Sequence, residues 1–194
     1  MAVLTAAAIK GRFLPAIKST SSSQDSAIEA TVDRADALLA AHLGVTLADD
    51  GTRSLGAKTY DIYLLGPGGK VLRLPWFSPS GLTITERVGR SSDKVVSSSD
   101  YEVRGRLVYK NSGTWLSSSL PELRVQGSGG GAIATTSPLY EAIGLLTAHL
   151  WNIPKLQGRS ALSQNGKSQT VRDGEVAIPA NVKALVSHLR VGWF

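Results

Sequence analysis

The chain has 194 residues, of which 42 % are hydrophobic and 19 % are charged, and its formal net charge is +6. This composition fits one globular domain of ordinary size and excludes both a disordered chain and one built of membrane spans. Cysteine is absent and histidine occurs three times, which excludes disulfides, thiolate nucleophiles and every metal site that needs cysteine ligands.

The charges are unevenly distributed along the chain. Residues 1–50 carry four bases and six acids, residues 51–110 carry ten bases and five acids, and residues 142–194 carry six bases and two acids. The pattern indicates two differently charged faces, with an ordinary solvated surface as the alternative. A pI near 9.7 is typical of nucleic-acid binding, but the sequence contains neither a basic helix nor an aromatic-rich strand.

A first long helix is predicted from about Gln24 to Leu43. Ser23 or Asp25 can cap its start, and acidic residues in its first half interact favourably with the helix dipole. Gly44 follows as the residue that ends the helix in a left-handed conformation. Apolar residues recur at spacings of three and four and so lie on one face of this helix: Ile28, Val32, Ala35, Leu39 and Leu43.

Between about residues 58 and 126 the apolar spacing changes from the helical period to a period of two. Apolar residues alternate with polar ones along residues 60–64 and again along residues 82–88, and a turn is predicted at residues 66–69. Short strands separated by Gly, Pro and Ser clusters indicate a small antiparallel sheet or barrel. Three further short strands are expected, at residues 71–74, 107–109 and 123–125.

A second long helix is predicted from residue 138 to residue 151. Ser137 is the expected N-cap, and Pro138 occupies the first helical position, where its missing N–H costs nothing. Pro154 is expected to end the helix.

The rest of the chain is expected to be less regular. Residues 155–178 are rich in Gln, Ser, Gly and Lys, which is typical of a loop or hairpin, and Asp173-Gly174 is the predicted turn. A short helix is predicted over residues 181–189. The expected fold is a single α+β domain, a small helical bundle with an inserted antiparallel β region. Its parts are a helical part at 1–57, the β-rich insertion at 58–126, a core helix at 137–154, the loop or hairpin at 155–178, and a C-terminal helix and tail at 179–194.

Two glycine-containing motifs resemble nucleotide-binding loops but lack the required context. Residues 127–132 match the G-x-G-x-x-A pattern, yet the next helix begins too late for them to cradle a pyrophosphate, and no βαβ unit surrounds them. Residues 165–168 resemble the end of a P-loop, but Ala161 stands where its first glycine belongs. We therefore interpret the first as a flexible strand-to-helix connection and the second as a chance match.

The candidate catalytic groups are isolated from one another. Three histidines lie near the predicted C-terminal ends of helices, where the helix dipole favours them as structural residues: His42, His149 and His188. Asp100 or Glu102 is the candidate base if the chain is an enzyme, which requires a histidine or a second acid to converge on it in the fold. The favoured expectation is a protein without catalytic activity, cofactor or metal.

Several stretches occur together in one order: the capped acidic helix ending in AAHLG at 40–44, LTIT at 82–85, SDYEV at 99–103 leading to GRLVY at 105–109, PLYEAIGLLTAHLW at 138–151, and IPANVKALV at 178–186. In this order they resemble the head-to-tail connector, or adaptor, proteins of long-tailed bacteriophages and related gene-transfer particles. The resemblance extends over about residues 23–190.

The resemblance implies a structural virion protein that forms a ring, usually of twelve subunits, below the portal of a DNA-filled head. Its partners would be copies of itself, the portal protein and a tail-side neck, stopper or tail terminator protein, with double-stranded DNA in the lumen bound without sequence specificity. A C-terminal tail would contact the portal: Leu189, Arg190, Val191, Gly192, Trp193 and Phe194. The contact between subunits would use the acidic helix and the basic middle of the chain: Asp25, Glu29, Asp33, Asp36, Arg87, Arg104 and Arg106.

A small basic nucleic-acid-binding domain is the alternative function, because the net charge is positive. The start of the chain lacks the basic region of a secretory signal, and no apolar run approaches the ~20 residues needed to cross a bilayer. We therefore expect a protein that is assembled in the host cytoplasm, has no membrane contact and resides in the neck of the virion.

Overall fold

The computed structural model describes residues 4–17, 22–88, 92–131, 133–156, 161–164, 167–170 and 178–189. The chain divides into two compact units, one that joins residues 1–39 to residues 133–194 and one formed by residues 40–132. The second unit is therefore an insertion in the first. The expected α+β class, a helical part with an inserted antiparallel β region, is confirmed.

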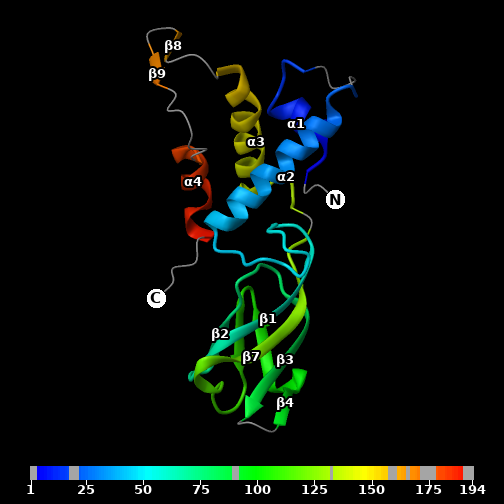
Figure 1. The fold of residues 1–194 in the computed structure, drawn as a ribbon, viewed down its shortest axis with the longest axis vertical. Helices are drawn as coiled ribbons and strands as arrows, with labels where there is room; N and C mark the ends of the chain where they lie inside the picture. Colours follow the sequence, from blue (N-terminus) through cyan, green and yellow to red (C-terminus); the bar gives the residue numbers. More distant parts are fainter. Residues whose placement is uncertain are drawn as a thin grey trace. The chain divides into compact units, whose positions relative to one another are not determined.

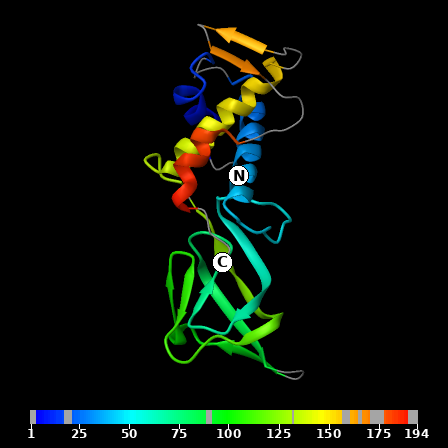
Figure 2. The same ribbon diagram turned by 90° about the vertical axis from the view of Figure 1, so that its left-hand side faces the viewer.

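The first unit, here called the helical unit, contains α1 (Ala6–Arg12), α2 (Asp25–His42), α3 (Pro138–Leu156) and α4 (Ala180–Val186), with a 3-10 turn at Ser187–Leu189. Figures 1 and 2 both show α4 alongside α3, and the two helices are in contact. α3 lies at the centre of the core of this unit, because many of its own side chains are buried. These side chains are Tyr140, Ala142, Ile143, Leu146, Thr147 and Leu150.

Both long helices lie close to their predicted limits. Ser137 caps α3 as predicted, because its Oγ accepts a hydrogen bond from the N–H of Leu139 at 3.2 Å. Pro154 does not end α3, and in this respect the prediction is wrong: the helix continues to Leu156. A proline within a helix removes one N–H donor, here the one that would bond to the carbonyl of Leu150, and α3 ends two residues later.

α2 ends in the motif that its sequence predicts. Gly44 has a φ of 70°, and the N–H groups of Gly44 and Val45 donate to the carbonyls of Ala41 and Ala40 at 3.1 and 2.9 Å. This is the Schellman arrangement, in which a left-handed residue lets the backbone satisfy carbonyls at the helix end. Glycine adopts that conformation without a steric penalty.

α1 is attached to the other helices through contacts on two sides. Lys10 is buried, and its Nζ forms an ion pair with Asp25 in the first turn of α2. The Phe13 ring lies 5.9 Å from the ring of Tyr140 on α3. It also packs so closely over Gly144 that a Cβ at that position would overlap it. These contacts fix α1 against both long helices.

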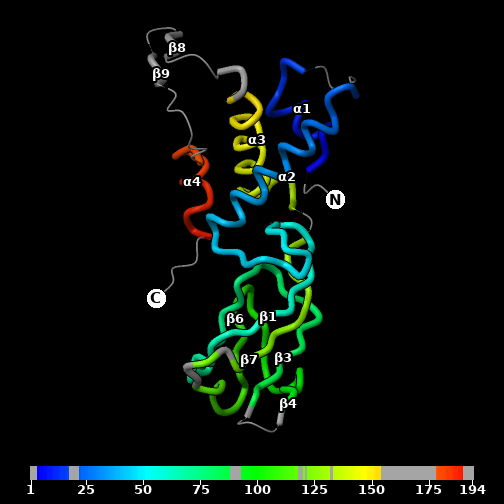
Figure 3. Tube along the Cα trace, viewed as in Figure 1, coloured from blue at the N-terminus to red at the C-terminus, as the bar shows by residue number. Residues whose placement is uncertain are grey.

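The second unit, here called the β unit, contains two antiparallel sheets. The four-stranded sheet has the order β1 (Lys58–Pro67), β7 (Ser117–Gly129), β3 (Ser80–Val88) and β4 (Ser92–Val96). The three-stranded sheet has the order β2 (Val71–Arg73), β6 (Leu107–Lys110) and β5 (Tyr101–Arg104), and a 3-10 turn at Ser98–Asp100 precedes β5. Figure 3 shows the backbone trace of this unit with strands β1, β3, β4, β6 and β7 labelled. Both sheets contribute buried side chains to the core: Tyr60, Leu72, Ile84, Val96, Val108, Leu123 and Val125.

The segment between α2 and β1 packs with the sheets. The N–H of Thr46 donates to the carbonyl of Pro75 at 2.9 Å, and the N–H of Asp49 donates to the carbonyl of Thr59 at 3.1 Å. The β unit consequently begins before residue 58 and ends after residue 126, the limits predicted from the sequence.

Neither β4 nor β5 is predicted from the sequence, which indicates a Ser-rich break after β3. Among the described strands, β4 pairs only with β3, with Val95 opposite Thr85, and β5 pairs only with β6, with Val103 opposite Val108. Short strands at a sheet edge bury few side chains, so their apolar alternation is weak.

The glycine-rich end of β7 also differs from its prediction as a flexible connection. Residues 127–129 continue the strand, with Gly127 opposite Tyr60 on β1. The reason is a side chain from elsewhere in the unit. Trp76 is fully buried, stacks on Tyr60 with ring centroids 4.5 Å apart, and lies where a Cβ on Gly129 would overlap its ring. Packing therefore requires glycine here.

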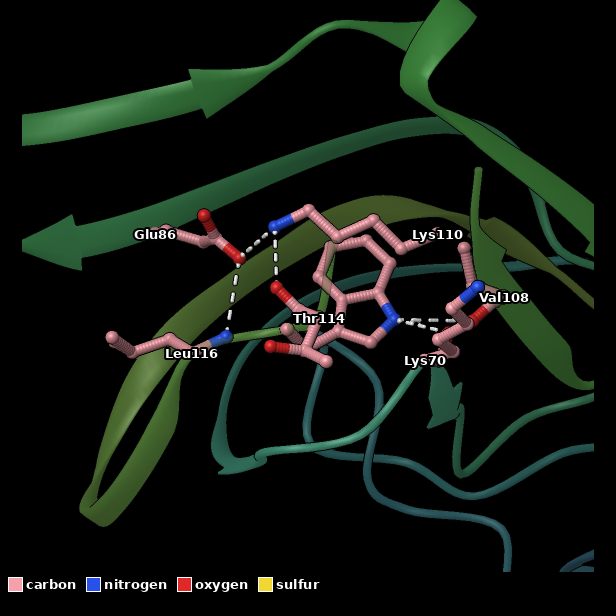
Figure 4. Close-up of polar contacts among 7 residues, drawn as sticks. Lys70, Glu86, Val108, Lys110, Thr114 and Leu116 are labelled. Atoms are coloured by element: carbon pink, nitrogen blue, oxygen red, sulfur yellow. Dashed lines mark hydrogen bonds and ion pairs between the residues drawn. The ribbon is translucent and has the colours of Figure 1, made fainter. Parts of the chain in front are cut away.

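A nearly buried ion pair joins the two sheets, as Figure 4 shows. Glu86 on β3 and Lys110 at the end of β6 have side chains that are 10 % and 16 % exposed, with Glu86 Oε1 2.8 Å from Lys110 Nζ. The same Oε1 accepts from the N–H of Leu116 at 3.3 Å, and the ammonium donates to the carbonyl of Thr114 at 3.0 Å. The ammonium also lies 4.9 Å from the centre of the Trp115 ring. Each charge thus has a second partner, which offsets part of the free energy needed to remove it from water.

Trp115 organises the backbone around this ion pair. Its indole N–H is shared between the carbonyls of Lys70 and Val108, at 3.1 and 3.3 Å. Its backbone N–H donates to the carbonyl of Gly69 at 2.8 Å. The turn before β2, strand β6 and the loop before β7 are therefore all held around one buried side chain.

The segment after α3 contains a hairpin. β8 (Ala161–Gln164) and β9 (Lys167–Thr170) pair in antiparallel fashion, within the stretch where a loop or hairpin is predicted. The predicted turn at Asp173-Gly174 lies outside the described residues. Within the described part of the chain, no helix combines the length and apolar character needed to span a membrane.

Replacing Gly129 by alanine should destabilise the β unit, because the added methyl group overlaps the Trp76 ring. Overpacking of this kind costs about 1–3 kcal/mol. Gly131→Ala is the matched control, since nothing lies within 4 Å of a Cβ at that position, and its effect should stay within about 0.5 kcal/mol. Urea unfolding followed by tryptophan fluorescence measures both variants. Equal stabilities would contradict the packing described for Trp76.

Lys110→Met keeps an unbranched apolar chain against Trp115 but leaves the Glu86 carboxylate without its cation. The free energy of unfolding should fall by roughly 3 kcal/mol. The double variant Glu86→Gln, Lys110→Met should recover much of this loss, because it buries no charge. Denaturation of the wild type, both single variants and the double variant gives the coupling energy. A coupling energy near zero would contradict a role for the pair in joining the sheets.

Candidate interaction surfaces

The acidic residues predicted for a contact between subunits lie on α2 in unlike environments. Asp25 is occupied by its ion pair with Lys10. Glu29 and Asp33, here called the acidic pair, are exposed one helical turn apart, and neither belongs to an ion pair among the described residues. Asp36 is only 3 % exposed, so it adds nothing to the surface of this helix.

Two of the three predicted basic residues have acidic partners within the chain. Arg87 Nε lies 3.2 Å from Asp93 on β4, and Arg104 donates two hydrogen bonds, of 2.9 and 2.8 Å, to the carboxylate of Glu102. All four side chains are more than half exposed, so water screens both pairs and each adds little to the stability of the fold. Both arginines remain on the surface.

Arg106 is half-buried and binds backbone instead. Its Nε donates to the carbonyl of Leu74 at 3.1 Å, and its two Nη atoms donate to the carbonyls of Leu43 and Gly44 at 3.4 and 3.5 Å. Burial, and secondarily the charge of Arg73, lowers the pKa of Arg106 to about 10. Because the end of a helix carries partial negative charge, Arg106 serves as a cap for α2.

The three-stranded sheet buries one face and exposes the other. Leu72 on β2 and Val108 on β6 are buried, so their neighbours along each strand point to the opposite side. Of the residues on the exposed face, the sequence prediction of the subunit contact included only Arg104. The other residues could have been found from the period of two along residues 71–73 and 107–110. We call this surface the basic face; it consists of Val71, Arg73, Glu102, Arg104, Leu107 and Tyr109.

Arginines flank an apolar centre on the basic face. In the sheet register Leu107 lies between Arg73 and Arg104. The Arg104 guanidinium also lies 5.4 Å from the centre of the Tyr109 ring. Since Glu102 is the single acid of the face, its net charge is positive.

The outer face of the four-stranded sheet is neutralised within itself. Asp61 accepts two hydrogen bonds from Arg124, at 2.9 and 2.6 Å, and one from Gln126 at 3.0 Å. The Arg124 guanidinium holds the pKa of Asp61 below its usual value, and the Asp61 carboxylate raises the pKa of Arg124. A small hollow on this face is lined by Tyr63, Thr85, Arg87, Asp93, Glu122 and Arg124.

Part of the positive charge of residues 51–110 is compensated inside the chain. A surface that follows nucleic-acid phosphates needs cations that are not already paired. Among the described residues, at least four of the ten bases in this segment form ion pairs: Lys58 with Asp50, Arg87 with Asp93, Arg104 with Glu102, and Lys110 with Glu86.

The two acids considered as catalytic bases lie close together in the chain, Asp100 in the 3-10 turn and Glu102 on β5. Arg104 lowers the pKa of Glu102, which makes that carboxylate a weaker base. Neither Asp100 nor Glu102 lines the hollow on the four-stranded sheet. Among the residues that the structure describes, no three His, Asp or Glu side chains gather closely enough to hold a metal ion.

Other residues singled out by the sequence lie apart from these surfaces. His42 ends α2 and His188 lies in the 3-10 turn, as expected, whereas His149 lies in the interior of α3 because that helix extends to Leu156. Of the predicted portal-contact tail, Leu189 is partly exposed, and residues 190–194 lie outside the described residues.

Asp61→Asn should lower stability only slightly near neutral pH, by less than about 1 kcal/mol, because the pair with Arg124 is partly exposed. Arg124 lowers the pKa of Asp61, so the ionised pair stabilises the fold above about pH 4 and loses this effect as the pH falls through the lowered value. Wild type and variant should therefore converge in stability at strongly acid pH. Urea unfolding at three pH values tests this, and a difference that grows toward low pH would contradict it.

The fold matches chains of solved structures. Comparisons with protein-family models and with curated protein sequences gave no match. A chain in the neck of an empty GTA (gene-transfer agent) particle, computed with C6 symmetry, is 14 % identical; 95 % of this chain and 89 % of that chain are covered, with a TM-score of 0.57. A chain in the neck of a native GTA particle, computed with C12 symmetry, is 14 % identical, with 100 % and 94 % covered and a TM-score of 0.56. The protein therefore shares its fold, over nearly its whole length, with chains from the necks of these particles.

Proposed function

We propose that this protein is a structural component of the neck of a tailed phage or phage-like particle. It acts as a ring-forming adaptor that joins the portal of a DNA-filled head to the tail or to the next neck protein. One observation carries the proposal: the fold match to GTA neck chains extends over 95 % and 100 % of this chain. The ordered stretches that resemble connector proteins support the same class of protein. The role is structural and needs no catalytic group or cofactor.

The C6 and C12 symmetries of those necks support a closed ring, and we propose twelve copies. A cyclic ring needs a heterologous contact, in which one surface of each copy meets a different surface of the next. Two unlike surfaces of this chain, the acidic pair on α2 and the basic face of the β unit, meet that requirement. Double-stranded DNA would pass through the lumen, where contacts to phosphates carry no sequence information.

The other neighbours in the neck are proposed from the resemblance. The C-terminal tail, Leu189 to Phe194, contacts the portal protein, and Trp193 and Phe194 give it two aromatic side chains of the kind that anchor protein contacts. A neck, stopper or tail terminator protein binds on the tail side. Assembly takes place in the host cytoplasm, and the protein resides in the virion.

Purified protein should form closed rings as its concentration rises, with twelve copies measured by native mass spectrometry and ring shapes in negative-stain electron microscopy. A variant that ends at His188 is the matched control. It should form the same rings, because the removed tail is assigned to the portal and not to the next subunit. It should also lose binding to the portal ring of the same particle.

A protein that stays monomeric at every concentration, with and without portal, would contradict the proposal, as would open filaments alone. DNA binding without any ring would support the nucleic-acid alternative instead. In that case affinity should fall by about 0.9 log units per phosphate contact for each tenfold rise in salt.

A further inference from the structure

A specific contact between neighbouring copies follows from the way charge is distributed over the two units. We propose that the basic face of the β unit of one copy binds the acidic pair, Glu29 and Asp33, on α2 of the next copy. The inference rests on the proposed ring and names the two surfaces that close it.

The acidic pair has the properties of a surface that is completed by a partner. Glu29 and Asp33 are four residues apart, so they lie on the same side of α2. Both are exposed, and like charges at this spacing repel each other and destabilise an isolated helix. Arg34 is exposed too, but adjacent residues on a helix point about 100° apart. A partner that supplies two cations would remove the repulsion.

The basic face has the chemistry of a protein contact. Leu107 and Tyr109 are partly exposed at its centre, and Val71 beside them is 38 % exposed. Tyrosine and arginine are enriched where proteins bind proteins, and a binding site typically has an apolar centre with a polar rim. Nucleic-acid phosphates would be matched by a continuous line of cations, without need of an apolar centre. The composition therefore favours an acidic protein surface over DNA.

The two surfaces match in spacing. Neighbouring strands lie about 4.8 Å apart, so the backbones of Arg73 and Arg104, one on each side of β6, are about 10 Å apart. Their long side chains can converge on two carboxylates whose residues are four positions apart, about 6 Å along the helix axis. Arg104 uses Nε and Nη2 on Glu102, which leaves the donors of Nη1 for a second carboxylate.

The two surfaces also carry charges of opposite sign. Arg73 and Arg104 exceed the single acid Glu102 by one, so the basic face has a charge of +1 and the acidic pair has a charge of −2.

This contact differs from the one expected from the sequence. Arg87 lies on the other sheet and pairs with Asp93. Arg106 caps α2, Asp25 is paired with Lys10, and Asp36 is buried. Of the residues expected at the contact, the proposed contact keeps Glu29, Asp33 and Arg104. It adds the other residues of the basic face.

Charge reversal tests the contact. The face-reversed variant carries Arg73→Glu and Arg104→Glu, and the helix-reversed variant carries Glu29→Lys and Asp33→Lys. Either variant alone places like charges at every contact, so its ring population should fall at least tenfold at a concentration where the wild type is assembled. In an equal mixture, each intact surface meets a complementary one. Rings that contain six copies of each variant should therefore return, and native mass spectrometry distinguishes them by mass.

Arg53→Glu with Lys183→Glu is the matched control. Both residues are exposed outside the basic face, and the variant has the same change in net charge as the face-reversed protein. It should assemble like the wild type. Circular dichroism and thermal unfolding should show that all three variants are folded.

Rings formed by both reversed variants on their own would overturn this contact and leave the proposed ring intact. Folded variants that assemble neither alone nor when mixed would also overturn it. If the face-reversed variant forms rings like the wild type but those rings retain less DNA, the basic face would be assigned to DNA binding instead. A wild type that forms no ring would overturn the proposed function and the contact with it.

Discussion

The ion pair between Glu86 and Lys110 is the interaction on which the β unit depends. Its two charges belong to different sheets, so their attraction fixes one sheet against the other. In nearly dry surroundings such a pair is stable only when further groups satisfy both charges, and the loop before β7 supplies them. That loop also carries Trp115, whose indole N–H holds the carbonyl of Lys70 just before β2. The placement of β2, and with it Arg73 on the basic face, follows from this cluster.

Sheet register also decides which charges remain available for a partner. Asp61 and Arg124 are 63 positions apart and meet because β1 pairs with β7. The net charge of a segment could therefore predict the sign of a region, but not which of its residues are paired. For the same reason the burial of Asp36 and the capping role of Arg106 could not be predicted. Fewer of the charged residues expected at the subunit contact are exposed than the sequence predicts. The exposed surfaces are the acidic pair on α2 and the basic face, where arginines flank an apolar centre.

The helices were predictable because their signals are local. The apolar spacing predicted both α2 and α3. Ser137 marked the start of α3, and Gly44 marked the end of α2. The order of strands was not predictable, because β1 and β7 pair across most of the β unit. The glycines that end β7 resemble a loop until the ring of Trp76, more than 50 residues earlier, is known to fill the space beside Gly129. Edge strands such as β4 lack the two buried neighbours that would produce a strong alternation.

A cryo-electron microscopy map of the neck of a particle that carries this protein tests the central claim most directly. The account predicts a closed ring of twelve copies next to the portal, with DNA in its lumen. Within the ring, Arg73 and Arg104 of each copy lie against Glu29 and Asp33 of the next. Density for the protein outside the neck, or a ring in which those four residues face solvent, would contradict the account.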